Sequence, residues 1–192
     1  DIETYGAVTL NNITASGNTG GSGAVIGNHN AVTPAAVTLT GVNQFNNNIS
    51  GSYGLWIRSK GSIAVSNLTA SNNANGLGAK LDNNGGTSTA TVTLTGVNAF
   101  IENGGTGLSI DTNGIVNLTK VTADGNNQDG VYISANTSNV NLTCASITNN
   151  TQTGYSVYTT GLTTFKGVVV AGNGAMNVIG GSLVQTIGCP LP

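Results

Sequence analysis

The sequence predicts an all-β fold, a solenoid of short parallel strands wound in about seven coils, over one domain of residues 1–192. Three observations predict it. The segment VTLTGVN occurs twice, at 37–43 and 92–98, which places the copies 55 residues apart. Apolar residues alternate along this segment, as they do in a strand with one buried face. Only 6% of residues are charged and 29 are glycine, so strand and turn formers dominate.

VTLTGVN belongs to a looser unit that occurs seven times and supplies the first strand of each coil. The seven segments are AVTLNNI (7–13), AVTLTGV (36–42), SIAVSNL (62–68), TVTLTGV (91–97), IVNLTKV (115–121), NVNLTCA (139–145) and LTTFKGV (162–168). Their second residues follow one another at intervals of 29, 26, 29, 24, 24 and 23 residues. The two VTLTGVN copies are therefore two coils apart.

An asparagine, a glycine and a second alternating strand complete each unit. The asparagines are Asn18, Asn48, Asn73, Asn103, Asn126, Asn150 and Asn173. The second strands are GAVI (23–26), GLWI (54–57), GAKL (78–81), GLSI (107–110), GVYI (130–133) and GYSV (154–157), with a degraded seventh copy near AMNVI (175–179). Turn residues close each unit.

A unit of about 25 residues is too short for a strand–helix–strand repeat of about 30 or more. It suits one coil of a solenoid, in which equivalent residues stack about 4.8 Å apart. Two aliphatic files are expected inside. One is Leu10, Leu39, Val65, Leu94, Leu118, Leu142 and Phe165, and the other is Ile13, Val42, Leu68, Val97, Val121, Ala145 and Val168. The asparagines are expected to form a structural ladder, and the glycines to supply positive-φ turns.

The V-x-L-x-x-V…N…G-φ-x-φ coils, where φ is apolar, span nearly the whole chain and resemble the right-handed parallel β-helix proteins. These form the pectate-lyase-like superfamily with its generic parallel β-helix repeat members. The resemblance implies a single-stranded right-handed parallel β-helix. It leaves the function open, because that superfamily includes polysaccharide lyases, glycosidases, adhesins, phage tailspikes and structural surface proteins.

Enzymes that resemble this fold use carboxylate clusters, often with calcium, and an Arg, Lys or His base. The single histidine, His29, lies in the insertion GNHNAVTPA (27–35), where an inert loop residue is expected. No Asp-x-Asp pair or acidic run indicates a calcium site. Asp82 and Asp111 are the one plausible carboxylate pair for glycosidase chemistry. The sequence therefore predicts no catalytic residues, no metal site and no cofactor.

One face of the second strands carries the most chemistry, in two outward rows. The first row is Trp56, Lys80, Ser109, Tyr132 and Ser156, and the second is Arg58, Asp82, Asp111, Ser134 and Tyr158. We call these two rows the aromatic–charged strip. As a carbohydrate-binding surface, it would stack Trp56 or Tyr132 on sugar rings and use Arg58, Lys80, Asp82 and Asp111 as polar contacts. The competing interpretation is an Arg58–Asp82 ion pair among ordinary solubilising side chains.

The outer face of the first strands is rich in threonine. Its two files are Thr9, Thr38, Ala64, Thr93, Asn117, Asn141, Thr164 and Asn11, Thr40, Ser66, Thr95, Thr119, Thr143, Lys166. Thr-x-Thr ranks resemble the ice-binding surfaces of antifreeze solenoids. Threonine and asparagine are also ordinary exposed strand residues.

Composition limits the partners. A net charge of −2 provides no basic patch, so nucleic acid is not expected, and no apolar run approaches the roughly 20 residues of a membrane helix. Cys144 and Cys189 could pair in an oxidising compartment or stay free.

The expected function is a non-catalytic structural or adhesive module, secreted or on the cell surface of a bacterium or archaeon. A polysaccharide-binding or polysaccharide-cleaving domain is the alternative, and ice binding is the second alternative.

The two ends predict self-association. DIETYGAVTL (1–10) aligns without gaps on SIDTNGIVNL (109–118), so residue 1 falls inside a second strand and the first coil begins part-way round. The last partial coil and tail, 180–192, contain SLVQTI and no amphipathic covering helix. Open coils present unpaired backbone groups. Either the chain was excised from a longer solenoid, or copies join head to tail as filaments.

Overall fold

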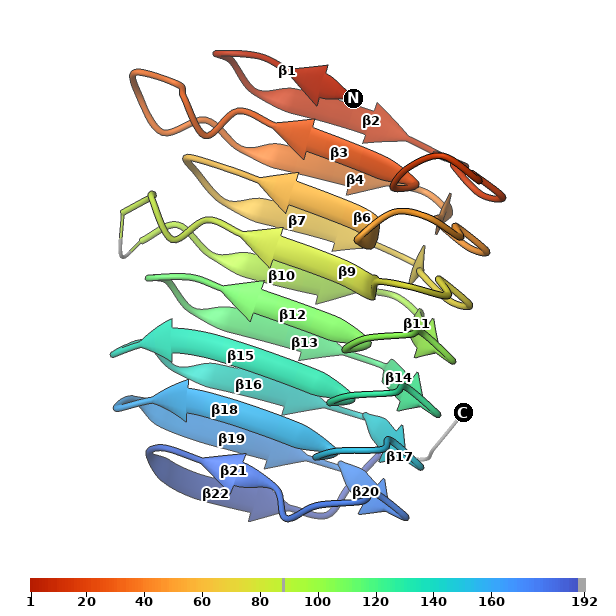
Figure 1. Ribbon diagram of the computed structural model, residues 1–192. Coiled ribbons are helices and arrows are strands. Elements are labelled where there is room, and N and C mark those ends of the chain that lie inside the picture. Colours follow the sequence, from red (N-terminus) through yellow and green to blue (C-terminus); the bar gives the residue numbers. More distant parts are fainter. Residues whose placement is uncertain (88, 190–192) are drawn as a thin grey trace.

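The computed structural model describes residues 1–87 and 89–189, and these form β-strands and no helix. The strands stack in three parallel sheets, which the chain visits in turn as it winds (Figure 1). Two of the sheets have eight strands each, so the solenoid has about eight turns. This confirms the predicted all-β parallel solenoid, with a coil count close to the seven expected.

Sheet A contains the predicted second strands. It runs β1 (Ile2–Glu3), β3 (Ala24–Gly27), β6 (Tyr53–Arg58), β9 (Leu77–Asp82), β12 (Leu108–Asp111), β15 (Val131–Asn136), β18 (Tyr155–Thr159) and β21 (Val178–Ile179). Sheet B contains the predicted first strands. It runs β2 (Val8–Asn11), β4 (Val37–Thr40), β7 (Ile63–Ser66), β10 (Val92–Thr95), β13 (Val116–Thr119), β16 (Val140–Thr143), β19 (Leu162–Lys166) and β22 (Ser182–Thr186).

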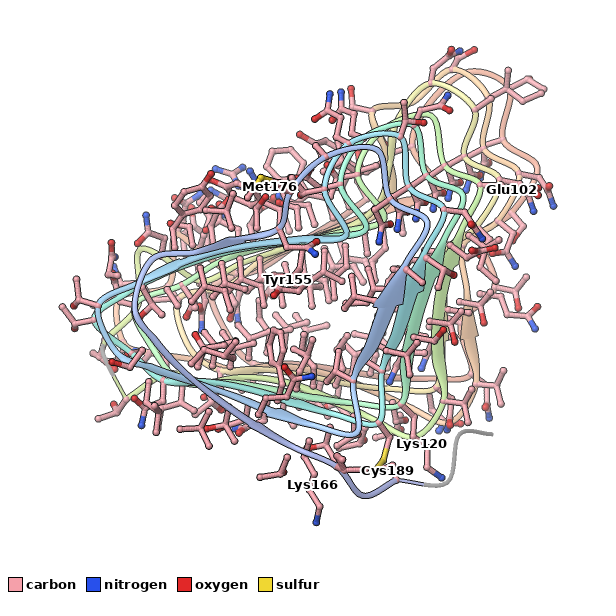
Figure 2. All side chains as sticks on the ribbon, turned by 90° about the horizontal axis from the view of Figure 1, so that it is seen from below. Glu102, Lys120, Tyr155, Lys166, Met176 and Cys189 are labelled. Atoms are coloured by element: carbon pink, nitrogen blue, oxygen red, sulfur yellow. A yellow bond between two sulfur atoms is a disulfide. The ribbon has the colours of Figure 1, made fainter. Side chains whose placement is uncertain are left out.

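Sheet C was not predicted. Its order is β20 (Val169–Ala171), β17 (Ser146–Thr148), β14 (Val121–Asp124), β11 (Asn98–Ile101), β8 (Leu68–Thr69) and β5 (Asn43–Gln44). These strands have only two to four residues, too few to show an alternating pattern. Sheet C makes the cross-section three-sided, as the view along the axis shows (Figure 2).

The interior is a stack of apolar files, because parallel neighbours pair in register. Leu94 in β10 pairs with Val65 in β7 and with Leu118 in β13, and the three side chains are no more than 2% exposed. The first predicted file is buried from Leu39 to Phe165. Burying one such side chain stabilises the fold by about 1.5–3 kcal/mol. The core therefore runs the length of the solenoid.

A single residue with positive φ makes each corner between sheets B and C. The corner residues are Asn12, Gly41, Asn67, Gly96, Lys120, Cys144 and Gly167, with φ between 45° and 73°. Asparagine and glycine tolerate this conformation best, so Lys120 and Cys144 are less usual occupants. One left-handed residue is enough to turn the chain onto the next face.

The second predicted file is wrong at Val42 and Val97, which are 53% and 57% exposed. Asn43 and Asn98 take the interior positions instead, pairing with Leu68 and Val121. The cause is one extra residue at these two corners, and a one-residue shift turns each following side chain to the opposite face.

Buried amides close these two longer corners. Nδ2 of Asn43 donates to the carbonyls of Thr40 at 3.2 Å and Ser66 at 2.9 Å, and its Oδ1 accepts from the amide of Ile13 at 3.2 Å. Asn98 makes the equivalent contacts with Thr95, Thr119 and Leu68. The duplicated VTLTGVN therefore forms the same specialised corner at two places that lie two coils apart.

The same two-coil period appears at the corner between sheets A and B. Nδ2 of Asn28 donates to the carbonyl of Ala35 at 2.8 Å, and Nδ2 of Asn83, 55 positions later, donates to that of Ala90 at 3.1 Å. Each asparagine closes a long loop, and each is at most 1% exposed. The structural unit over this part of the chain is thus a pair of coils.

Glycines were expected to supply positive-φ turns, and Gly41 and Gly96 do so, but none of the six glycines that open the second strands has a positive φ. These glycines are needed because the backbone there passes too close to neighbouring atoms to leave room for a Cβ. A Cβ on Gly107 would lie 2.7 Å from Nδ2 of Asn126 and 2.7 Å from the carbonyl oxygen of Gly130. The backbone of sheet A passes directly against the asparagine side chains.

The chain beyond β22 is tied back to the solenoid. Cys189 forms a disulfide with Cys144, two coils earlier, across a separation of 45 residues. The disulfide crosses the corner at Gly167. A Cβ added to Gly167 would lie 2.7 Å from the Cβ of Cys189. Figure 2 shows Cys189 at the same corner of the outline as Lys120 and Lys166. Of the predicted tail 180–192, residues 190–192 lie outside the described residues.

Candidate functional site

The aromatic–charged strip lies on the outer face of sheet A, and strand register places its members. Trp56 pairs with Lys80, Lys80 with Ser109, and Ser109 with Tyr132. In the second row Arg58 pairs with Asp82, Asp82 with Asp111, and Asp111 with Ser134. Both rows alternate with inward-facing residues such as Leu81 and Ile110, and within the rows Ser109 and Ser156 are only 6% and 4% exposed.

Trp56 stands at the end of the strip nearer the N-terminus, in contact with two neighbours. Its ring centroid is 4.8 Å from that of Tyr53, and the guanidinium carbon of Arg58 lies 5.0 Å from the indole centroid. This cation–π contact holds Arg58 over the ring. Trp56 is half-buried, and its Nε1 is buried without a hydrogen-bond partner among the described residues. One side of the indole is therefore already covered.

The ion pair in the strip is Lys80–Asp111, with Nζ 3.0 Å from Oδ2. The Arg58–Asp82 pair suggested by the sequence is wrong: although the two residues are in register, the described charged side chains make no such contact within 4.0 Å. Partial burial alone would lower the pKa of Lys80. The hydrogen bond and charge of Asp111, together with the charge of Asp82, outweigh it and raise that pKa above 10.5.

Tyr132 and Tyr158 occupy the other end of the strip. Their ring centroids are 5.6 Å apart and the ring planes are inclined by 47°. Burial, followed by the charge of Asp111, raises the pKa of Tyr132. The strip therefore has an aromatic cluster at each end and an ion pair between them.

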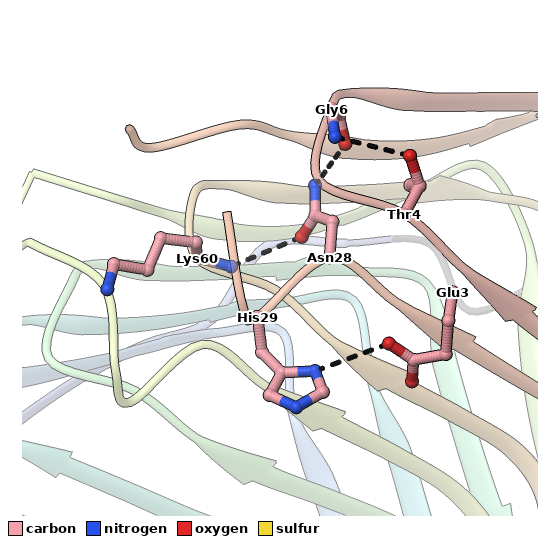
Figure 3. Close-up of polar contacts among 6 residues, drawn as sticks. All are labelled: Glu3, Thr4, Gly6, Asn28, His29 and Lys60. Atoms are coloured by element: carbon pink, nitrogen blue, oxygen red, sulfur yellow. Dashed lines mark hydrogen bonds and ion pairs between the residues drawn. The ribbon is translucent and has the colours of Figure 1, made fainter. Parts of the chain in front are cut away.

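His29 lies beside a carboxylate that sequence reasoning missed. Its Nδ1 lies 3.8 Å from Oε2 of Glu3 (Figure 3). With Thr4, Tyr5, Asn30 and Arg58, this pair lines an open cavity of about 360 Å³. The signal that could have found it is strand register: Glu3 pairs with Gly27, two residues before His29.

A buried amide positions the backbone beside this cavity. Asn28 is fully buried, its Nδ2 donates to the carbonyl of Gly6 at 3.0 Å, and its Oδ1 accepts from the amide of Lys60 at 3.2 Å (Figure 3). These bonds join three successive coils. The loop that carries His29 is therefore anchored at its first residue.

The asparagine ladder runs inside the corner between sheets C and A. In each step, the main-chain amide and Nδ2 of one asparagine both donate to Oδ1 of the next, from Asn18 to Asn173. From Asn48 onward, each Nδ2 also donates to a main-chain carbonyl, as Asn126 does to Phe100 at 3.0 Å. Asn48 to Asn150 are at most 1% exposed, so their hydrogen bonds replace water.

The threonine face of sheet B is less regular than its sequence. Oγ1 of Thr40 donates to the carbonyl of Leu10 at 3.3 Å, and Oγ1 of Thr119 donates to that of Leu94 at 2.9 Å. These hydroxyls turn toward the neighbouring coil. Ala64 interrupts the other rank and leaves a hollow of about 100 Å³ between the threonines.

No group of three or more His, Cys, Asp or Glu side chains among the described residues is placed to hold a metal ion. Asp82 and Asp111 are neighbours in register, and Asp111 is engaged by Lys80. Within the same residues, no helix is long and apolar enough to cross a membrane.

Comparison with known proteins provides no relative. No family model matches the chain, and neither the curated proteins nor the solved structures contain a match.

Proposed function

We propose that this chain is a non-catalytic structural or adhesive module that works outside the cell, secreted or on the cell surface. The observation that carries the proposal is the Cys144–Cys189 disulfide, because disulfides form and persist in oxidising compartments. The uninterrupted core and the ladder favour a rigid rod. We further propose that it is a structural relative of the pectate-lyase-like superfamily.

A polysaccharide-degradation assay tests the lack of catalysis. The chain is incubated with neutral and acidic polysaccharides, with and without calcium, and both unsaturated products and new reducing ends are measured. No product above the heat-denatured control is expected. Product that disappears in an Asp82→Asn, Asp111→Asn double variant would contradict the proposal and favour a glycosidase.

The proposed extracellular location is tested by measuring whether Cys144 and Cys189 are oxidised in the protein as it is isolated. Protein isolated from the medium or cell surface, with thiols blocked at lysis, is expected to carry no alkylated cysteine until it is reduced. Recovery of the chain mainly in the cytoplasm, with both thiols alkylated, would contradict an extracellular role.

The second candidate function is glycan binding by the aromatic–charged strip. It is favoured by aromatic rings at both ends of a flat outer face, where Trp56 and Tyr132 lie three strand spacings apart, or about 14 Å. Aromatic rings with a polar edge suit sugar rings, which present apolar faces and a hydroxyl rim. A glycan array, repeated with Trp56→Ala and Tyr132→Ala, tests it. A ligand whose signal is unchanged in both variants would bind elsewhere.

We also propose that copies of this chain associate end to end. All five residues of β22 are exposed, and Ile2 and Leu183, at opposite ends of the solenoid, are 39% and 41% exposed. Strand edges and apolar ends of this kind favour pairing with another chain. Sheet C has fewer strands than sheets A and B, so a stacked copy would meet the sheet A and sheet B edges first.

A further inference from the structure

Tyr132 and Tyr158 are diagonal neighbours on two adjacent strands. Tyr132 in β15 pairs with Ser156 in β18, and Ser134 in β15 pairs with Tyr158. Parallel strands lie about 4.8 Å apart and rise about 6.6 Å in two residues, so the Cβ atoms of these diagonal neighbours are roughly 8 Å apart, within reach of aromatic rings. The four residues form a square with tyrosines on one diagonal and serines on the other.

The serines allow the rings to meet. A small side chain beside each tyrosine leaves space above the sheet, and the two ring centroids lie 5.6 Å apart. The ring planes are inclined by 47°, so neither ring covers the other. Tyr158 is 46% exposed and Tyr132 is half-buried. The pair is therefore preformed, and Tyr158 is its more exposed member.

We propose that Tyr132 and Tyr158 are a site of oxidative cross-linking, which joins two successive coils through a dityrosine bond. The oxidant is hydrogen peroxide used by a haem peroxidase. Each phenol loses one electron and one proton, and the two phenoxyl radicals couple through the carbons ortho to oxygen. The ortho hydrogens then move to the oxygens as protons and restore both phenols. One C–C bond replaces two C–H bonds, and the peroxide becomes two water molecules.

Proximity makes this pair selective. Two groups held in contact on rigid strands react without the entropic cost of an encounter. Among the other tyrosines, Tyr53 stacks on Trp56, Tyr155 packs edge-on against Phe165, and Tyr5 is 76% exposed with no aromatic partner among the described residues. Tyr5 is therefore the residue expected to couple between molecules, and Tyr132–Tyr158 within one.

The inference uses the proposed extracellular role only to place the chain where such oxidants occur, and the chemistry is tested on purified protein. Folded protein at low concentration is treated with horseradish peroxidase and limiting peroxide. The expected product is a monomer lighter by two hydrogen atoms, with dityrosine fluorescence and a cross-linked peptide pair that contains Tyr132 and Tyr158. Its Tm should rise, because the new bond closes a loop in the unfolded chain.

Single substitutions test whether Tyr132 and Tyr158 are the two residues that couple. Tyr132→Phe and Tyr158→Phe should each abolish the intramolecular product, while Tyr5→Phe and Tyr53→Phe should retain it. The melting curve of each variant before oxidation shows that it is folded. Intramolecular dityrosine that persists in Tyr132→Phe, or coupling seen only in dimers, would overturn the proposal. Its failure would leave the structural role untouched, since that role is tested by location and by polysaccharide turnover.

Discussion

Oδ1 of Asn126 accepts two hydrogen bonds from Asn103, one from the main-chain amide at 3.1 Å and one from Nδ2 at 2.9 Å. Nδ2 of Asn126 in turn donates to Oδ1 of Asn150 at 2.8 Å and to the carbonyl of Phe100 at 3.0 Å. One fully buried side chain therefore links its own coil to the coil before it and the coil after it. This explains why the ladder position accepts asparagine and no apolar residue.

Asn126→Ala should lower the free energy of unfolding by roughly 1–3 kcal/mol, because buried donors and acceptors lose their partner. Urea denaturation followed by circular dichroism measures it. The matched control is Asn127→Ala: Asn127 is adjacent and exposed, and should change little. Equal effects of the two substitutions would mean that the ladder is a solvated turn.

Removing the disulfide should destabilise the last coils. The double variant Cys144→Ser, Cys189→Ser loses a link that closes a loop of 45 residues, which stabilises a protein by about 2–4 kcal/mol. Thermal unfolding of the variant and of reduced wild type should agree. If neither differs from the oxidised protein, the link contributes nothing to stability.

Trp56 fluorescence should respond to Arg58. Because Trp56 is the single tryptophan, its quenching by acrylamide reports one site. The wild type should be quenched to an intermediate extent, since the indole is half-buried beneath Arg58. Arg58→Ala should uncover the ring and increase the Stern–Volmer constant, whereas Lys60→Ala should not. Unchanged quenching in Arg58→Ala would show that the cation does not cover the ring in solution.

The Lys80–Asp111 pair should stabilise the fold up to alkaline pH. The pKa of Lys80 is raised in the folded state, so its contribution is fully present below the unfolded value of 10.5 and is lost as pH rises through the folded value. Asp111→Asn should therefore cost up to about 1 kcal/mol near neutral pH, with a smaller difference above pH 10.5. Unfolding curves at pH 7 and pH 11 measure it. A difference that grows with pH would contradict the assigned pair.

End-to-end association should appear as a mass that rises with concentration. Size-exclusion chromatography with light scattering is expected to detect species above the 19.1 kDa monomer, and Leu183→Lys should reduce them by placing a charge at an exposed end of the core. Val32→Lys is the control, because Val32 is 92% exposed on a side loop. A monomer at high concentration, without fibres by electron microscopy, would exclude self-assembly.

The repeated sequence by itself determined the solenoid. Alternation of apolar residues specifies which side chains face inward, and an interval of 23–29 residues between equivalent positions leaves room for a coil of strands but not for a helix. The paired copies of VTLTGVN also marked the two-coil period that Asn28 and Asn83 share. These features are local, so they are readable along the chain.

Only the tertiary structure decided where the inward–outward alternation of side chains shifts by one residue and which residues from distant parts of the sequence come into contact. An extra corner residue turns Val42 outward and places Asn43 in the core, because the chain must return to the register of the coil beside it. The Lys80–Asp111, Glu3–His29 and Cys144–Cys189 contacts join residues from different coils. The sequence shows that such charged residues and cysteines are present. The distances between them follow only from how the coils stack, because they depend on strand register and on the path of the loops across 26 to 45 residues of chain.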